Sequence, residues 1–196
     1  MGSGRLLATA LLGTALMGAT EARAVFTVTV DQVGVDVVTT GSGTLDLTDL
    51  TFIDTESPRA VIVADDGGVS AVSVGTPPFS PADVYSQPTS FPLFGTGLVF
   101  IPDTGSGDKV GVQQTFVFVS AGYVSGSALS STDTYDNESL NSMGLTPGTY
   151  MVSWGTGVHA DSFVLDIVAP APEPASLALL GAGLAALGAV RRRKRA

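Results

Sequence analysis

The sequence has no cysteine, one histidine and very few basic residues between its two ends. The lack of cysteine excludes thiol catalysis, thiolate metal sites and lipid attachment to an N-terminal cysteine. Because His159 is the only histidine, most zinc chemistry is excluded, and a Ser-His-Asp triad would depend on that residue alone. Between positions 25 and 174, Arg59 and Lys109 stand against seventeen acidic residues, a net charge of −15 compared with −9 for the whole chain. A surface of this charge repels phosphates, so we expect no nucleic-acid partner.

Two long apolar runs stand near the ends of the chain. The first covers residues 6–19, follows Arg5 and precedes Ala22-Arg23-Ala24. A basic residue, an apolar core of this length and a small-x-small tripeptide are typical of a secretory signal peptide. We therefore predict a signal peptide over residues 1–24, with Ala22 and Ala24 at its cleavage site. The alternative, an uncleaved N-terminal anchor, is disfavoured because the run is too short to span a bilayer well.

The second run covers residues 175–190 and stands between a Pro-Glu-Pro tripeptide and a basic cluster. Its length gives about 24 Å of helix, and long basic side chains can reach the headgroups of a bilayer core of about 30 Å. A helix packed against a domain would have a polar face, whereas this run is apolar all round, so we predict a transmembrane helix. The tripeptide is Pro172, Glu173 and Pro174, and the basic cluster is Arg191, Arg192, Arg193, Lys194 and Arg195.

The basic flanks of both runs predict the topology. Basic flanks stay on the cytoplasmic side of a membrane, so the region between the two runs should lie outside the cytoplasm. Its length, about 150 residues, is that of one domain. The predicted organisation is a signal peptide (1–24), an extracytoplasmic domain (25–169) and a C-terminal sorting and anchor segment (170–196).

The order and spacing of the C-terminal features resemble the PEP-CTERM sorting signal of Gram-negative bacteria. In that family an exosortase, a membrane-embedded transpeptidase-like enzyme, recognises the Pro-Glu-Pro segment and processes the protein. The resemblance implies that the exosortase and the export machinery are partners. It also implies an inner-membrane-anchored precursor, a product at the cell surface or outside the cell, and an association with exopolysaccharide matrix or biofilm.

Short β-branched and aromatic runs, separated by Gly, Asp and Pro, predict strands throughout the middle region. Asp65-Asp66-Gly67-Gly68 predicts a hairpin turn, and the proline-rich stretch 75–102 predicts mostly loop with a short edge strand at 98–101. No segment has the period of a long amphipathic helix. We therefore expect an all-β fold, an antiparallel and jelly-roll-like β-sandwich. The expected strands are 25–30, 33–40, 44–47, 60–63, 69–74, 110–120, 149–154 and 162–168, with turns at 41–43 and 155–157.

Parts of the middle region resemble the body of a recurrent group of small PEP-CTERM proteins. This second resemblance implies a shared β domain and no known activity. The blocks that carry it are 43–50, 122–129, 145–150 and 154–163.

Candidate sites in the middle region are few. His159 lies two residues before Asp161, and such a pair can orient an imidazole for general base catalysis, although a solvated loop histidine is more common. There is no Gly-x-Ser-x-Gly elbow, and no acid pair stands out for glycoside hydrolysis, so we predict no catalytic residue and no enzyme. The acidic stretches 103–108 and 133–138 could each supply two or three oxygens to calcium, but structural turns are the better interpretation, and we expect no cofactor. The weak metal candidates are Asp103, Asp108, Asp133 and Asp136.

Three hypotheses for function follow. The first is an exported, non-enzymatic surface or envelope protein of unknown molecular activity. The second is a carbohydrate-binding module, calcium-dependent through its acidic loops, with extracellular polysaccharide as ligand and Trp154 or Tyr123 as contacts. For Trp154 a core position is favoured, because a sugar platform needs an exposed ring face. The third, a hydrolase of extracellular polymers, is the least favoured.

Overall fold

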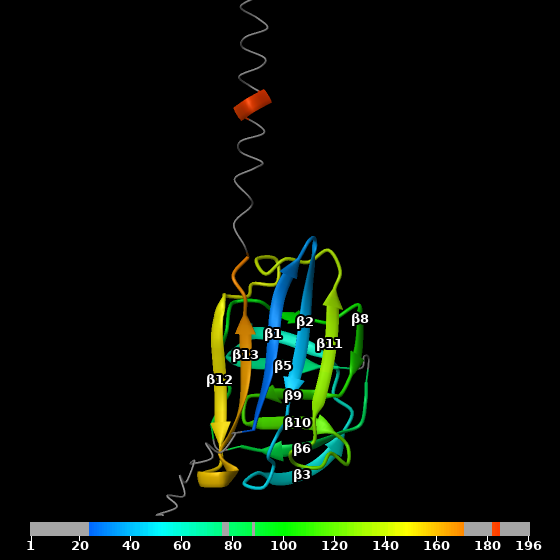
Figure 1. The fold of residues 1–196 in the computed structure, drawn as a ribbon, viewed down its shortest axis with the longest axis vertical. Helices are drawn as coiled ribbons and strands as arrows, with labels where there is room; N and C mark the ends of the chain where they lie inside the picture. Colours follow the sequence, from blue (N-terminus) through cyan, green and yellow to red (C-terminus); the bar gives the residue numbers. More distant parts are fainter. Residues whose placement is uncertain (1–23, 76–78, 88, 171–181, 185–196) are drawn as a thin grey trace, which may run out of the picture.

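The computed structural model describes residues 24–75, 79–87, 89–170 and 182–184. Its body consists of two β-sheets that pack face to face around one core, with the strands of one running crosswise to those of the other (Figure 1). This is the orthogonal type of sheet packing. Besides residues 182–184, the helical structure of the described residues is one 3-10 turn, η1 (Gly157–His159). The prediction of an all-β fold is confirmed.

The first sheet has six strands. It includes the hairpin β1–β2, whose two-residue loop starts at Gly34 with a φ of 67°, a left-handed conformation that glycine adopts readily. In spatial order the strands are β12 (Gly148–Trp154), β13 (Asp161–Ile167), β1 (Val25–Val33), β2 (Asp36–Gly43), β11 (Leu129–Tyr135) and β8 (Thr104–Gly107).

The second sheet has seven strands and more irregular pairing, with register shifts in β3 and β4. The predicted hairpin turn between β4 and β5 is confirmed, because the Gly68 N–H donates to Asp65 Oδ1 at 2.8 Å. In spatial order the strands are β3 (Thr51–Glu56), β6 (Ala82–Ser86), β10 (Phe116–Ser120), β9 (Val110–Gln113), β5 (Val69–Val74), β4 (Val61–Asp66) and β7 (Val99–Phe100).

One strand pair differs from the antiparallel sandwich expected from the sequence. β1 and β13 pair in parallel over six residues, from Val25 opposite Ser162 to Val30 opposite Ile167. The prediction of a wholly antiparallel sheet was therefore wrong. Because the first and last strands of the body run side by side in the same direction, residue 24 and residue 170 lie at opposite ends of the sandwich (Figure 1).

Several strand boundaries also differ from the prediction. The predicted turn at 41–43 lies within β2, and residues 44–47 form no strand. The predicted single strand at 110–120 is a hairpin, β9–β10, which turns at Gln114 with a φ of 49°. The prediction missed β3, β6, β8 and β11.

The core lies between the two sheets and is lined by alternate residues of each strand. On β1, Phe26, Val28 and Val30 are fully buried, as expected for a strand with one face inward. Phe163 on β13 packs its ring 5.9 Å from the rings of Phe26 and Phe91. Burying such aliphatic and aromatic side chains supplies the main driving force for folding, about 1.5–3 kcal/mol for each large side chain.

Most of the predicted end segments lie outside the described residues. This applies to residues 1–23 of the signal peptide, to the Pro-Glu-Pro tripeptide and to the basic cluster; of the run 175–190, residues 182–184 are described. In the described part of the chain, no helix combines the length and the hydrophobicity needed to cross a bilayer.

Candidate functional site

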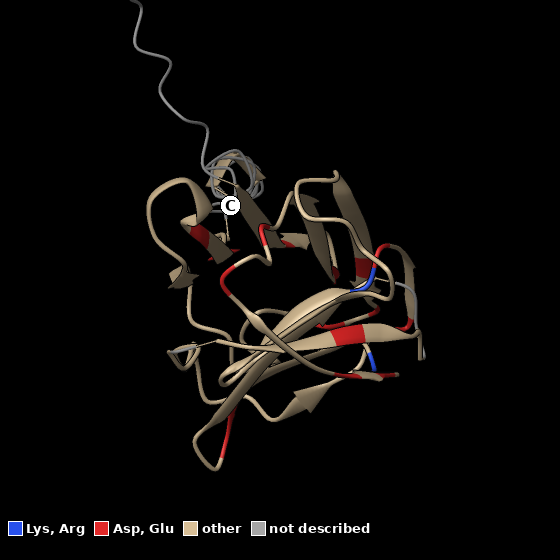
Figure 2. Ribbon diagram, turned by 90° about the horizontal axis from the view of Figure 1, so that it is seen from below, with Lys and Arg blue, Asp and Glu red and all other residues tan. Residues whose placement is uncertain are grey.

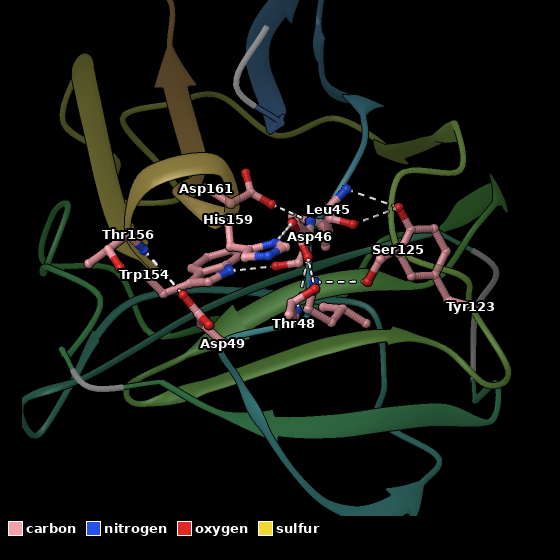
Figure 3. A network of polar contacts seen from close by, with 11 residues as sticks. Leu45, Asp46, Thr48, Asp49, Tyr123, Ser125, Trp154, Thr156, His159 and Asp161 are labelled. Carbon is pink, nitrogen blue, oxygen red and sulfur yellow. Dashed lines mark hydrogen bonds and ion pairs between the residues drawn. The ribbon is translucent and has the colours of Figure 1, made fainter. Parts of the chain in front are cut away.

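The loop that follows β2, residues 44–50, closes the end of the sandwich where β12 ends and β13 begins. This loop has no regular strand pairing, so its polar groups need other partners. It receives them from side chains of three distant segments, around residues 123, 154 and 161 (Figure 3). We refer to this loop and its partners as the loop network.

Asp46 is the centre of the loop network. Its backbone N–H donates to Asp161 Oδ2 at 2.5 Å, and its carbonyl accepts from Trp154 Nε1 at 2.8 Å. Its carboxylate accepts from the Thr48 N–H at 2.9 Å and lies 2.8 Å from His159 Nδ1. One residue therefore joins the loop to the ends of β12, β13 and η1.

The rest of the loop is fixed in the same way. Leu45 N–H donates to the Tyr123 hydroxyl at 2.9 Å, and Leu47 N–H donates to Ser125 Oγ at 3.0 Å. Asp49 Oδ2 accepts from the Thr156 N–H at 3.2 Å. Hydrogen bonds to buried or half-buried backbone groups are expected to stabilise one conformation of the loop.

The only histidine pairs with a different acid from the one its sequence position suggested. Sequence proximity pointed to Asp161, whereas His159 Nδ1 contacts Asp46, 113 residues away in the chain. The hydrogen bond to this carboxylate raises the pKa of His159 above its usual value. Partial burial raises the pKa of Asp46, but hydrogen bonds from Thr48 and His159 outweigh that effect, so the pKa of Asp46 is lowered overall.

Asp161 is instead a structural carboxylate beneath the loop. It is 4% exposed and accepts hydrogen bonds from the Asp46 and Ser162 N–H groups. Burial raises its pKa to about 6 against the effect of these two bonds, and the nearby Asp46 charge adds to the increase.

The chemistry available in the loop network is limited. Its imidazole is accessible to solvent, but no serine, threonine or tyrosine hydroxyl in the described part of the chain hydrogen-bonds to it. The adjacent hollow, lined by Trp154 and Asp161, has a volume of about 160 Å³. Ligand pockets usually measure about 300–1,000 Å³, so this hollow is small for an organic substrate. The network fits a role in holding the loop better than a role in catalysis.

Trp154 and Tyr123, the sugar contacts of the carbohydrate-binding hypothesis, both hydrogen-bond to the loop. Trp154 is 3% exposed and lies in the core, so the prediction of a core position is confirmed and a stacking platform at this residue is wrong. The Tyr123 hydroxyl, half-buried, lies within hydrogen-bond distance of the Leu45 and Ser127 carbonyls.

A larger hollow lies on the outer face of the seven-stranded sheet. Its main part has a volume of about 320 Å³ and an apolar floor that includes Val61 and Phe118. A neighbouring part of about 240 Å³ shares Glu56, Gln113 and Phe118 with it. We refer to the two parts together as the outer groove. No sequence signal pointed to it, because its residues come from all seven strands of the sheet.

The four weak metal candidates do not converge. Asp103 and Asp108 each accept a backbone hydrogen bond, from Asp136 N–H and Ser130 N–H respectively. Asp133 is buried on β11, which extends to Tyr135, so the interpretation of 133–138 as a turn was wrong for its first three residues. Within the described ranges, no group of three or more potential ligands is arranged for a metal ion. Figure 2 shows the acidic residues spread over the body.

Comparison with protein families finds one match, at the C-terminal end. Residues 170–194 match the model of the PEP-CTERM protein-sorting motif. No curated protein and no solved structure matches the chain. The match covers the tail and leaves the β body unassigned.

The chain therefore carries a cell-surface sorting signal of the kind that exported proteins have. This signal is a PEP-CTERM protein-sorting motif, and the motif implies processing by an exosortase. The sorting residues expected from the sequence, Pro172, Glu173 and Pro174, fall within the matched range.

Proposed function

We propose that this protein is a non-enzymatic surface protein whose β-sandwich is displayed outside the cell after an exosortase processes its tail. The PEP-CTERM match at residues 170–194 is the observation that carries this proposal. In this proposal the signal peptide directs export, the apolar run 175–190 holds the precursor in the inner membrane, and the mature protein joins the extracellular polysaccharide matrix.

The direction of the last strand supports a display role. β13 ends at the opposite end of the sandwich from the loop network, and the sorting motif begins three residues later. A domain held by its C-terminal end therefore presents the loop network away from the membrane. The net charge of the body favours solubility in that location.

Alanine substitution of Pro172, Glu173 and Pro174 tests the proposal. We expect the variant to accumulate as an unprocessed precursor in the membrane fraction, whereas the wild type appears processed at the surface or in the medium. Pro170→Ala is the matched control, because it changes a neighbouring proline outside the tripeptide. Normal processing of the triple variant would contradict the proposal.

A second candidate function, binding of a neutral polysaccharide, is favoured by the outer groove. Sugars present apolar faces edged by hydroxyl groups, and protein sites for them combine aromatic surface with a few polar groups. The groove is lined by the half-buried Phe116 together with Gln113 and Glu56. Arg59 lines the larger part of the outer groove. The net charge of the body disfavours anionic polymers, so the candidate ligand is uncharged.

Binding to an array of neutral glycans by the exported protein tests this second candidate. We expect saturable binding that Phe116→Ala weakens at least tenfold and that Val35→Ser, in the exposed β1–β2 loop, leaves unchanged. The assay is run with calcium and with a chelator, which separates a calcium-dependent site from a calcium-independent one. Absence of saturable binding, or equal binding by Phe116→Ala, would exclude the groove as a sugar site.

A further inference from the structure

The only lysine between positions 25 and 174 is buried in the interior of the protein. Lys109 is 1% exposed, and its Nζ has no hydrogen-bond partner among the described residues. Lysine is almost never fully buried unless it is paired, because removing an ammonium group from water is unfavourable. In a body this acidic, surface positions for a lysine are plentiful, so the buried position calls for a specific reason.

A buried carboxyl group faces the same region from the other sheet. Asp133 is on β11 of the six-stranded sheet and is 1% exposed. Its Oδ2 accepts a hydrogen bond from the Gly75 N–H at 3.0 Å, while Oδ1 has no partner in the described part of the chain. The Lys109 and Asp133 side chains interact electrostatically. They do not hydrogen-bond to one another.

The backbone places Lys109 and Asp133 near the point where the chain passes from one sheet to the other. Lys109 lies between β8 in the six-stranded sheet and β9 in the seven-stranded sheet. Its N–H donates to Ser120 Oγ at 2.9 Å, which fixes the crossing. Gly75, which binds the Asp133 carboxylate, packs so closely here that an added Cβ would lie 1.9 Å from the Asp108 carbonyl oxygen and 3.0 Å from Lys109 N. Asp133 therefore reaches the segment that carries the lysine.

The environment favours the uncharged form of each group. Burial lowers the pKa of Lys109, and burial raises the pKa of Asp133 to about 6. A neutral amine is a nucleophile, and a neutral carboxyl group can lose its hydroxyl as water. Tyr135, on the same inward face of β11, adds a buried hydroxyl without a partner among the described residues.

We propose that Lys109 and Asp133 condense to form an isopeptide bond that links the two sheets. The Lys109 Nζ lone pair attacks Asp133 Cγ, the C–N bond forms, and the C–OH bond breaks. The hydroxyl leaves as water with one amine proton, and the second amine proton stays on the amide nitrogen. The balance is therefore one amine plus one acid giving one amide and one water. Tyr135 is a positioning residue, whose hydroxyl donates to the carboxyl oxygen as negative charge develops on it.

The bond has a physical advantage for this fold. It replaces two buried ionisable groups by one neutral amide. It also closes a loop between Lys109 and Asp133 that constrains the unfolded chain in the way a disulfide does, in a protein that has no cysteine. A protein outside the cell, where refolding is not assisted, gains resistance to unfolding from such a link.

Intact mass of the purified full-length chain tests this proposal directly. After both ends are assigned by peptide mapping, the wild type is expected to be lighter than its sequence by the mass of one water. A digest is expected to contain a branched peptide that joins the segment around Lys109 to the segment around Asp133. Lys109→Met and Asp133→Ala are each expected to have the full mass calculated from their sequences, and Tyr135→Phe is expected to form the bond more slowly.

Two outcomes would overturn the proposal, and neither depends on whether a variant folds. One is a wild-type protein of full mass that yields unbranched peptides with free Lys109 and Asp133. The other is a water loss that maps elsewhere, for example to a cyclised aspartate at Asp66-Gly67.

Discussion

The outer faces of the two sheets are built from different side chains, although both inner faces line the same core. The outward positions of β1 and β11 are largely hydroxyl residues, such as Thr27, Thr29 and Thr132. The outward face of the seven-stranded sheet instead carries Val84 and Phe118, which form a second small apolar cluster with Ala82 and Phe116. A solvated sheet face normally resembles the first arrangement, and a contiguous apolar face marks a surface that binds something.

The difference between the two outer faces separates residues that stabilise the domain from residues that are candidates for binding. The six-stranded sheet contains the first and last strands of the body and anchors the loop network, so its residues are expected to act mainly on stability. The seven-stranded sheet shares the core but leaves its outer groove open, so outward substitutions there are expected to act on binding more than on folding.

Two phenylalanine truncations test this division with the largest expected effect. Phe163 is fully buried between the sheets, so Phe163→Ala should lower the free energy of unfolding by about 3–5 kcal/mol. Phe118→Ala, on the outer face, should lower it by about 1–2 kcal/mol because the space it leaves opens to the groove and to water. Chemical denaturation monitored by Trp154 fluorescence measures both values. Equal losses would show that the outer cluster is a structural core.

Removing the indole hydrogen bond should have the next largest effect on stability. Trp154→Phe keeps an aromatic ring in the core but leaves the Asp46 carbonyl without its donor, at a cost of about 1–3 kcal/mol. Amide hydrogen exchange should then increase in residues 44–50 more than in β9 or β10. Exchange that increases uniformly across both sheets would argue that the indole fills space and does not hold the loop.

The buried acid of the loop network predicts an unusual dependence of stability on pH. The pKa of Asp161 in the folded protein is about 6, compared with 3.8 in an exposed setting, so the folded state binds this proton more tightly than the unfolded state. Stability should therefore rise as the pH falls from about 6 to about 4. Asp161→Asn should flatten the slope of thermal midpoint against pH in this window. An unchanged slope in the variant would exclude Asp161 as its source.

The smallest effect is expected for the exposed ion pair. His159→Ala removes the contact with Asp46, whose strength is limited by solvent. The pKa of His159 is raised in the folded protein. The ion pair therefore stabilises the fold below the ordinary histidine pKa, and this stabilisation disappears as the pH rises through the pKa of the folded state. The thermal midpoints of variant and wild type should converge at alkaline pH and at high salt. A large difference that persists in high salt would point to a further role for the ring.

The parts of the fold that follow a regular pattern were predictable from the sequence. β1 alternates apolar residues with threonine, the β4–β5 turn has Asp and Gly at the positions that need them, and β12–β13 are separated by glycines. Each of these signals is local, so a single sequence is enough to detect it.

The missed elements have identifiable physical causes. β11 carries Ser131 and Asp133 at inward positions, so its burial does not appear as an apolar pattern. β6 lies in a proline-rich stretch, and the β9–β10 turn uses Gln114 at a positive φ, where glycine or asparagine is usual. The pairing of Asp46 with His159 and of β1 with β13 depends on tertiary contacts between residues more than 100 positions apart.

Intact mass of the native protein, recovered separately from the cell envelope and from the medium, tests the central claim most directly. If the protein is exported and processed by an exosortase, the mature form should begin at Val25 and should lack the basic cluster Arg191 to Arg195. A native protein with the mass of the complete chain from Met1 to Ala196 would contradict the account.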